Sequence, residues 1–204
     1  MLTFDHIAVS SEALGPGTAD VEEALGQPLL PGGQHPDMGT HNRLLSFGPD
    51  EYFELIAIDP DARAPDQPRW FNLDAFSGRT RVTNWICRCD DLDAAIAAAP
   101  EGVGVPWSLQ RADLRWSMAV PADGKLPFEG LFPALIQWHG EAHPAPRLQD
   151  TGVRLRELRL FSPDAGALRA ALAPLIRDAR VCVFAAEVAR IEAVVSTPGG
   201  DVVL

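Results

Sequence analysis

The stretch GTHNRLLSFGPDEYFELIAID, from Gly39 to Asp59, reads as two β-strands joined by a turn at Gly48–Asp50. Gly, Pro and Asp are typical turn residues, and apolar side chains recur on both sides of them. Glu54 lies inside the second strand, between Phe53 and Leu55. A buried carboxylate is costly unless it has a partner. Three histidines are candidates for that partner: His6, His35 and His41.

Length and composition predict a globular protein with a sizeable core. The chain has 204 residues, of which 47% are hydrophobic, and a formal net charge of −11. That charge argues against nucleic acid and anionic membranes as partners, because both require a basic face. No apolar stretch approaches the roughly 18 residues of a membrane span. Three cysteines without metal-binding spacing, and no signal-like start, lead us to expect a cytoplasmic protein.

Three parts of the chain share one pattern. FDHIAVSS, VTNWICRCDD and LRELRLFSPD are each followed by a helix rich in Ala and Leu and then by three strand-like segments. Ser and Asp residues at each joint are typical helix N-caps. We therefore predict an α+β fold of repeated βαβββ units, with residues 1–60 as unit one and 82–140 as unit two. Residues 61–81 form a linker, and 153–204 form a compact third unit.

Strand alternation sorts the faces of unit one. If the helix covers the Phe53 face, His6 and Glu54 share the open face of the sheet. An imidazole and a carboxylate suit a divalent transition metal such as Zn, Mn, Fe or Ni. Without metal, the same pair suits a catalytic base and the group that orients it. The bland alternative is a buried His–Glu hydrogen bond without function.

Several short motifs resemble those of a known family. DHIAVS, GGQHPDMGTHNRLLSFG, YFELIAIDP, RWFNLD, DLRWSMAVP and LIQWHG are similar to the glyoxalase-like domain family of bacterial proteins, in the vicinal oxygen chelate superfamily. The resemblance covers most of the chain and implies curved mixed sheets around a cup-shaped pocket. Units one and two would form this cup, and unit three would pack beside them or complete a second half-cup.

The resemblance also implies a metal pattern, which the chain matches only in part. His6 and Glu54 fall at the first-strand and fourth-strand ligand positions, and His41 is a candidate third ligand. The equivalent positions of unit two fall on Trp85 and Ala134, which cannot bind a metal. The superfamily usually takes three or four protein ligands, so the predicted metal site is incomplete. His35 is expected at the rim of the cup.

Aromatic and polar residues of the strands are candidates for binding substrate. Trp85, Trp116 and Trp138 are expected to form an aromatic wall, although three core tryptophans would give the same pattern. Arg115 is either a clamp for a ligand carboxylate or a surface residue paired with an acid. Asn42 alternates with His41, so only one of the two can face the cup.

The end of unit two leaves one alternative open. Gln137 and His139 point outward if Glu54 is matched to Ala134, and a three-residue shift would instead bring Gln137 to a ligand position.

The leading hypothesis is a small-molecule enzyme of the vicinal oxygen chelate type, related to glyoxalases and dioxygenases, in which His6 and Glu54 are catalytic. The alternative is a metal-free protein that binds or sequesters a small molecule. A homodimer is a further expectation, because the terminal strand DVVL could pair between two chains.

Overall fold

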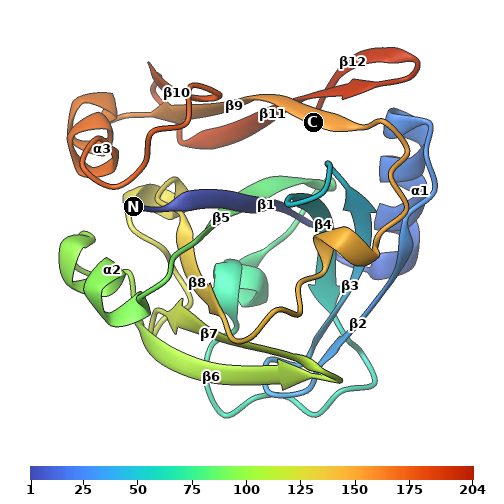
Figure 1. Ribbon diagram of the computed structural model, residues 1–204, viewed down its shortest axis with the longest axis horizontal. Helices are drawn as coiled ribbons and strands as arrows, with labels where there is room; N and C mark the ends of the chain where they lie inside the picture. Colours follow the sequence, from blue (N-terminus) through green and yellow to red (C-terminus); the bar gives the residue numbers. More distant parts are fainter.

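The computed structural model describes residues 1–204. Figure 1 shows a strongly curved sheet with a flatter second sheet above it. The curved sheet has eight strands: β1 (Thr3–Ser10), β2 (Leu30–His35), β3 (Thr40–Ser46), β4 (Tyr52–Ile58), β5 (Arg81–Arg88), β6 (Val105–Arg111), β7 (Leu114–Val120) and β8 (Ala134–Trp138).

The order of strands in this sheet shows two related halves. The order is β2-β3-β4-β1-β5-β8-β7-β6, so the first strand of each unit lies at the centre. β1 pairs with β4 in parallel, β5 pairs with β8 in parallel, and β1 and β5 are antiparallel to each other. The predicted α+β fold of repeated βαβββ units in a curved mixed sheet is confirmed.

One α-helix follows the first strand of each unit. These helices are α1 (Leu14–Leu25), α2 (Leu92–Ala98) and α3 (Ala165–Leu172). Asp91 caps α2 by accepting from the Ala94 N–H, and Asp164 caps α3 in the same way from Ala167. The expected serine cap of α1 is absent, because the Ser11 hydroxyl donates to the Ala13 carbonyl instead.

The third unit forms a separate four-stranded sheet rather than a second half-cup. It consists of β9 (Arg154–Ser162), β10 (Val181–Ala185), β11 (Arg190–Thr197) and β12 (Gly200–Val203), in the order β10-β9-β11-β12. Its apolar face joins the hydrophobic core of the curved sheet, and β11 packs against β5. Arg180 reinforces this junction with a bidentate ion pair to Glu51, at 2.7 and 2.6 Å.

Three short 3-10 helices lie in the connections: η1 (Trp70–Ala75), η2 (Phe128–Gly130) and η3 (Ala145–Arg147). The connection between β4 and β5 was expected to be a plain loop. Instead, η1 lies inside the curve of the sheet, where it is seen in turquoise in Figure 1, and its first residues Trp70 and Phe71 are buried. None of the helices is long and apolar enough to cross a bilayer.

The two faces of the curved sheet differ in what covers them. On the convex face, α1 packs against β3 and β4 and α2 packs against the strands of unit two. Phe53 and Leu55 are fully buried there. The concave face is left to the side chains of alternate residues, and this hollow contains the candidate site.

Candidate functional site

A small pocket lies in the hollow of the curved sheet and has a volume of about 30 Å³. Space for a single water requires roughly 10–15 Å³ on this measure, so the pocket has room for only a few atoms. Its polar lining comes from β1 to β4 and from the end of β6: His6, His35, Asn42, Tyr52, Glu54 and Arg111. All of these except Arg111 belong to unit one.

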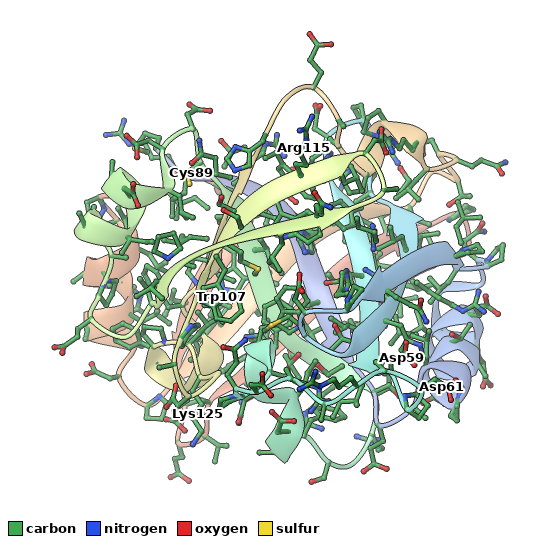
Figure 2. All side chains as sticks on the ribbon, turned by 90° about the horizontal axis from the view of Figure 1, so that it is seen from below. Asp59, Asp61, Cys89, Trp107, Arg115 and Lys125 are labelled. Carbon is green, nitrogen blue, oxygen red and sulfur yellow. The ribbon has the colours of Figure 1, made fainter.

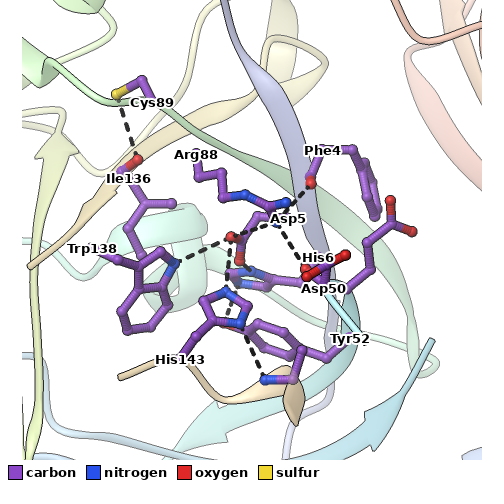
Figure 3. Close-up of polar contacts among 12 residues, drawn as sticks. Phe4, Asp5, His6, Asp50, Tyr52, Arg88, Cys89, Ile136, Trp138 and His143 are labelled. Atoms are coloured by element: carbon purple, nitrogen blue, oxygen red, sulfur yellow. Dashed lines mark hydrogen bonds and ion pairs between the residues drawn. The ribbon is translucent and has the colours of Figure 1, made fainter. Parts of the chain in front are cut away.

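His6 lies between the buried carboxylates of Asp5 and Glu54, and Figure 3 shows it beside Asp5. Its Nδ1 is 2.7 Å from Oδ1 of Asp5, and its Nε2 is 3.6 Å from Oε2 of Glu54. Tyr52 stacks on the imidazole with ring centroids 4.2 Å apart. Because the carboxylate of Asp5 accepts from the Nδ1 side, the Nε2 side is the one turned toward Glu54 and the pocket.

A β-bulge explains how two consecutive residues contact each other on one side of the sheet. The register between β1 and β5 shifts between Phe4 and His6, which leaves Asp5 without a paired residue. Simple alternation would direct Asp5 and His6 to opposite faces, and a bulge re-aims a side chain locally. The bulge therefore lets the carboxylate of Asp5 approach the imidazole.

Asp5 is held by more than His6. Its Oδ2 accepts hydrogen bonds from Nε1 of Trp138 and from Nε2 of His143, each at 3.1 Å, and lies 3.5 Å from Arg88. Four donors thus converge on a side chain that is fully buried. This arrangement fixes the carboxylate in position and keeps it ionised.

The pKa values follow from burial and pairing. Burial alone raises the pKa of Asp5, but hydrogen bonds from His143 and His6 outweigh it and hold that pKa well below its ordinary value. Burial likewise raises the pKa of Glu54, while the hydrogen bond and charge of His6 lower it to about 2. Burial lowers the pKa of His6, yet Asp5 and Glu54 together raise it above 6.5. The centre is therefore a basic imidazole between two ionised carboxylates.

A second polar chain runs from Glu54 to the end of β6. Nδ2 of Asn42 donates to Glu54 Oε1, and Oδ1 of Asn42 accepts from NH1 of Arg111 at 3.1 Å. The same NH1 is 3.2 Å from Nε2 of His35, whose Nδ1 is 3.0 Å from Oγ1 of Thr40. Since arginine only donates, His35 accepts at Nε2 and carries its proton on Nδ1. Burial lowers the pKa of His35 to about 4, so this imidazole is neutral.

Arg111 is the cation of this chain, and no carboxylate pairs with it. Its hydrogen bonds are to His35 and Asn42, and it forms no ion pair. It is half-buried. A guanidinium without a carboxylate partner at a pocket wall is suited to bind an anionic or carbonyl oxygen.

The opposite wall of the pocket is apolar. Trp116, Met118, Ile136 and Trp138 come from β7 and β8, and Trp70 and Phe71 come from η1. Trp116 and Trp138 lie with their ring centroids 5.6 Å apart. Nε1 of Trp70 is buried without a hydrogen-bond partner, and its indole meets His35 edge to face.

Three of the predicted site residues lie elsewhere. Trp85 pairs with Ile7, on the face opposite His6, and is completely buried with Nε1 donating to the Leu131 carbonyl. The prediction that Trp85 belongs to the aromatic wall was therefore wrong, because Trp85 is a core residue. His41 pairs with Ala57 and lies near Asp59, at 3.9 Å. It is not a candidate metal ligand with His6 and Glu54, because Asn42 takes the inward position of β3.

Arg115 also needs correction as a candidate for substrate binding. It is exposed on the outer side of β7, next to the inward-facing Trp116, and forms no ion pair. Figure 2 labels it on that strand.

The structure also shows which way the side chains at the end of β8 point. Gln137 accepts from the N–H of Leu92 at the start of α2, and His139 lies 2.8 Å from Ser117. Neither faces the pocket.

Several residues of the site were not predicted from the sequence. Strand alternation assigned Asp5 to the face opposite His6, because the bulge cannot be seen in the sequence. Arg111 lies at the end of a strand that contains no recognisable motif. Tyr52 belongs to the same strand as Glu54, and its alternation with Phe53 was a signal that could have found it. Trp70 and Phe71 occur in the motif RWFNLD, which indicated the family resemblance but did not predict where these two side chains lie in the fold. His35 was expected at the rim but lines the pocket.

The donor set does not fit a resident metal ion with three or four protein ligands. Nε2 of His6 and Oε2 of Glu54 are close enough to share one ion. No group of three His, Cys, Asp or Glu side chains in the structure is arranged so that it could hold a metal ion. Ile86 is paired with His6 across β1 and β5, Ala134 is paired with Ile86, and Asn42 turns its donor side to Glu54.

One of three similar solved structures supports the fold, with a TM-score above 0.5. A hypothetical protein from Staphylococcus aureus is similar over 93% of this chain and 88% of its own, with 14% identity and a TM-score of 0.58. A methylmalonyl-CoA epimerase from Mycobacterium tuberculosis is similar over 66% of this chain and 85% of its own, with 19% identity and a TM-score of 0.41. A Streptomyces coelicolor methylmalonyl-CoA epimerase in complex with 2-nitronate-propionyl-CoA is similar over 70% of this chain and all of its own, with 16% identity and a TM-score of 0.44.

No curated protein matches the chain. A family model does: the glyoxalase-like domain matches residues 4–176, which include both units of the curved sheet and the start of the third. The chain therefore belongs to the glyoxalase-like domain family.

Proposed function

We propose that the protein is an enzyme that transfers a proton at the carbon next to a carbonyl group of a small molecule, without a resident metal ion. The observation that carries this proposal is the position of His6 between Asp5 and Glu54, at 2.7 and 3.6 Å. An imidazole oriented by a buried carboxylate is the usual arrangement of a general base.

His6 is the base in this proposal, and Asp5 is the residue that positions it. Asp5 accepts the Nδ1 proton, so Nε2 faces Glu54 and the pocket, and its lone pair becomes available when the pH exceeds the raised pKa of His6. Asp5 also stabilises the imidazolium that forms when the base takes a proton. The raised pKa of His6 makes it a stronger base than a free histidine.

Arg111 supplies the positive charge that such a reaction needs. Removal of a proton next to a carbonyl leaves negative charge on the carbonyl oxygen, and a fixed cation at that oxygen lowers the barrier. Metal-dependent relatives would use an ion for this purpose, but the donor set here does not fit one. Arg111 has no carboxylate partner, and its guanidinium is held by Asn42 and His35.

The proposed substrate is small and partly apolar. Trp116, Met118 and Trp138 offer an apolar surface, while His6 and Arg111 supply polar contacts. A pocket of about 30 Å³ accepts such a molecule only after side chains move. The connection that carries Trp70 and Phe71 is the natural segment to move, because it belongs to neither half of the sheet.

Deuterium exchange tests the proposal directly. Pyruvate, acetoacetate and acetylacetone are incubated with the protein in deuterated buffer, and the loss of the C–H signal is followed by NMR. We expect exchange of at least one of them above the buffer rate, loss of that exchange in His6→Gln, and its retention in His139→Gln. His139 is a matched control, since it lies on the outer face. Exchange that survives in His6→Gln, or exchange of none of the three, would refute the proposal.

A metal-free binding protein is the second candidate function. The polar groups of the pocket already satisfy one another, as in the chain from Glu54 through Asn42 to Arg111. Such a network can hold a ligand without any reaction. This candidate predicts saturable binding of a carbonyl compound, monitored by the fluorescence of Trp116 and Trp138, with no exchange of its protons.

We also propose that the protein acts in the cytoplasm and that it forms a homodimer. All three cysteines are free, which suits action in the reducing cytoplasm. β12 is an edge strand of the second sheet and could pair with its copy in a homodimer. Sedimentation of the protein with and without the terminal residues 200–204 distinguishes a dimer formed through this edge from a monomer.

A further inference from the structure

A second and much larger cavity lies beside the pocket of the curved sheet. Its volume is about 460 Å³, within the range of roughly 300–1,000 Å³ that is usual for small-molecule sites. It is formed by η1, the start of β5, the connection around η2 and the start of β11. It therefore lies at the junction of the two sheets. Phe71 lines both cavities and separates them.

Charge distinguishes this second cavity from the rest of the molecule. The chain has a net charge of −11, yet Arg81, Lys125 and Arg190 line the cavity against a single carboxylate, Glu129. Lys125 is the only lysine of the chain, and it forms no ion pair. Arg81 lies over the ring of Phe76 at 4.3 Å and donates only to backbone carbonyls. Two cations are thus available to an anionic ligand.

A buried side chain in the wall has an unmet hydrogen-bonding need. Asn84 on β5 is 3% exposed, and its Oδ1 has no hydrogen-bond partner. Buried amide oxygens are nearly always paired, so an orphaned one at a cavity wall indicates a donor that a ligand supplies. A hydroxyl or N–H group would meet it.

Backbone strain gathers at the same place. Five residues other than glycine have positive φ, and three of them line this cavity: Phe71 at 59°, Asn72 at 52° and Glu129 at 56°. Phe128, at 55°, is the neighbour of Glu129. Residues other than glycine rarely adopt a positive φ, and those that do are concentrated at ligand sites.

We propose that this cavity binds a small hydroxycarboxylate with an apolar side group. Lys125 and Arg81 would hold the carboxylate, Asn84 Oδ1 would accept from the hydroxyl, and Phe71 and Phe76 would contact the apolar group. The proposal does not depend on the chemistry of His6, because Lys125, Arg81 and Asn84 line only the second cavity. Figure 2 shows Lys125 far from Arg115, so the cavity is also distinct from the outer face of β7.

Calorimetric titration with phenyllactate tests this assignment. The double variant Arg81→Gln with Lys125→Gln is expected to weaken binding by about tenfold or more, since it removes both charge-assisted contacts. Arg156→Gln is the matched control, because Arg156 is exposed on β9 and forms no ion pair. His6→Gln should leave the affinity unchanged. Absence of binding, or binding lost in Arg111→Gln but kept in the double variant, would overturn the proposal.

A second comparison isolates the role of Asn84. Phenylpropionate lacks the hydroxyl group of phenyllactate and should bind about fivefold to tenfold more weakly, the effect of one hydrogen bond. In Asn84→Leu this difference should vanish, while the melting temperature rises because an unpaired buried polar group has been removed. An undiminished preference for phenyllactate in a folded Asn84→Leu variant would contradict the assignment.

Discussion

The two halves of the curved sheet have the same topology and opposite chemistry. In unit one, the concave face holds His6, Asn42 and Glu54. In unit two, it holds Trp116, Met118, Ile136 and Trp138. The central strands of the two halves pair with each other, and His6 lies opposite Ile86. One half supplies charge and protons, and the other supplies an apolar surface.

This difference explains why the fold does not by itself provide a metal site. A metal site with three or four protein ligands would need unit two to add ligands to His6 and Glu54 of unit one. Here the fourth strand of unit two offers Ala134, and the residue of its central strand that lies opposite His6 is Ile86. The polar half has instead acquired a second carboxylate through the bulge at Asp5, and the end of β6 adds a cation, Arg111. If unit one supplies the catalytic groups and unit two only an apolar surface, substitutions in the two units should have different effects.

The largest effect is expected from replacing the base itself. His6→Gln should lower the rate of deuterium exchange by about a thousandfold, within the range for removal of a general base. Ile86→Val, in the facing position of unit two, should change the rate less than about threefold and reduce stability by about 1 kcal/mol. Similar losses in both variants would mean that the halves do not differ in function.

The stability of the protein should fall at acid pH because of His35. Its pKa is about 4 in the folded protein and near 6.5 when unfolded, so the unfolded state binds more protons between these values. Stability from this residue is complete above pH 6.5 and falls by about 3 kcal/mol as the pH drops to 4. Urea unfolding of His35→Gln should lack this fall.

His139→Gln serves as the control for that measurement, because His139 lies on the surface of unit two. It should unfold with the same pH dependence as the unchanged protein. An equal acid-induced loss of stability in His35→Gln and the unchanged protein would show that His35 is not held neutral.

A smaller effect is expected from the cation of the site. Arg111→Met should lower kcat/KM for exchange by about a hundredfold, since one oxyanion-stabilising group is lost. Arg115→Met, only four residues away but on the outer face, should leave kcat/KM unchanged. If the two variants behave alike, Arg111 does not act on the reacting oxygen.

The smallest effect belongs to the apolar half. Met118→Leu preserves volume in the wall of the pocket and should cost less than about 1.5 kcal/mol of stability. Because it removes no polar contact, the exchange rate should stay within about threefold of the unchanged protein. A larger kinetic loss, measured at equal stability, would assign unit two a more specific part in catalysis.

The sequence predicted the architecture well because the strands show a period of two and because Asp91 and Asp164 mark the starts of α2 and α3. It also brought His6 and Glu54 to a common face by counting alternate residues. Counting failed where the backbone is irregular. The bulge turned Asp5 toward His6, and Trp85 was assigned to the wrong face of β5. Trp70 and Phe71 come from a connection whose path no periodicity describes.

The central claim is that His6, oriented by Asp5, takes a proton without help from a metal ion. The most direct measurement is the pH dependence of deuterium exchange by protein treated with a chelator, with metal content measured in the same sample. We predict full activity without metal, an acid limb above pH 6.5 that reflects the raised pKa of His6, and a shift of that limb to lower pH in Asp5→Asn. Activity that disappears with the chelator and returns with a divalent metal would contradict the account.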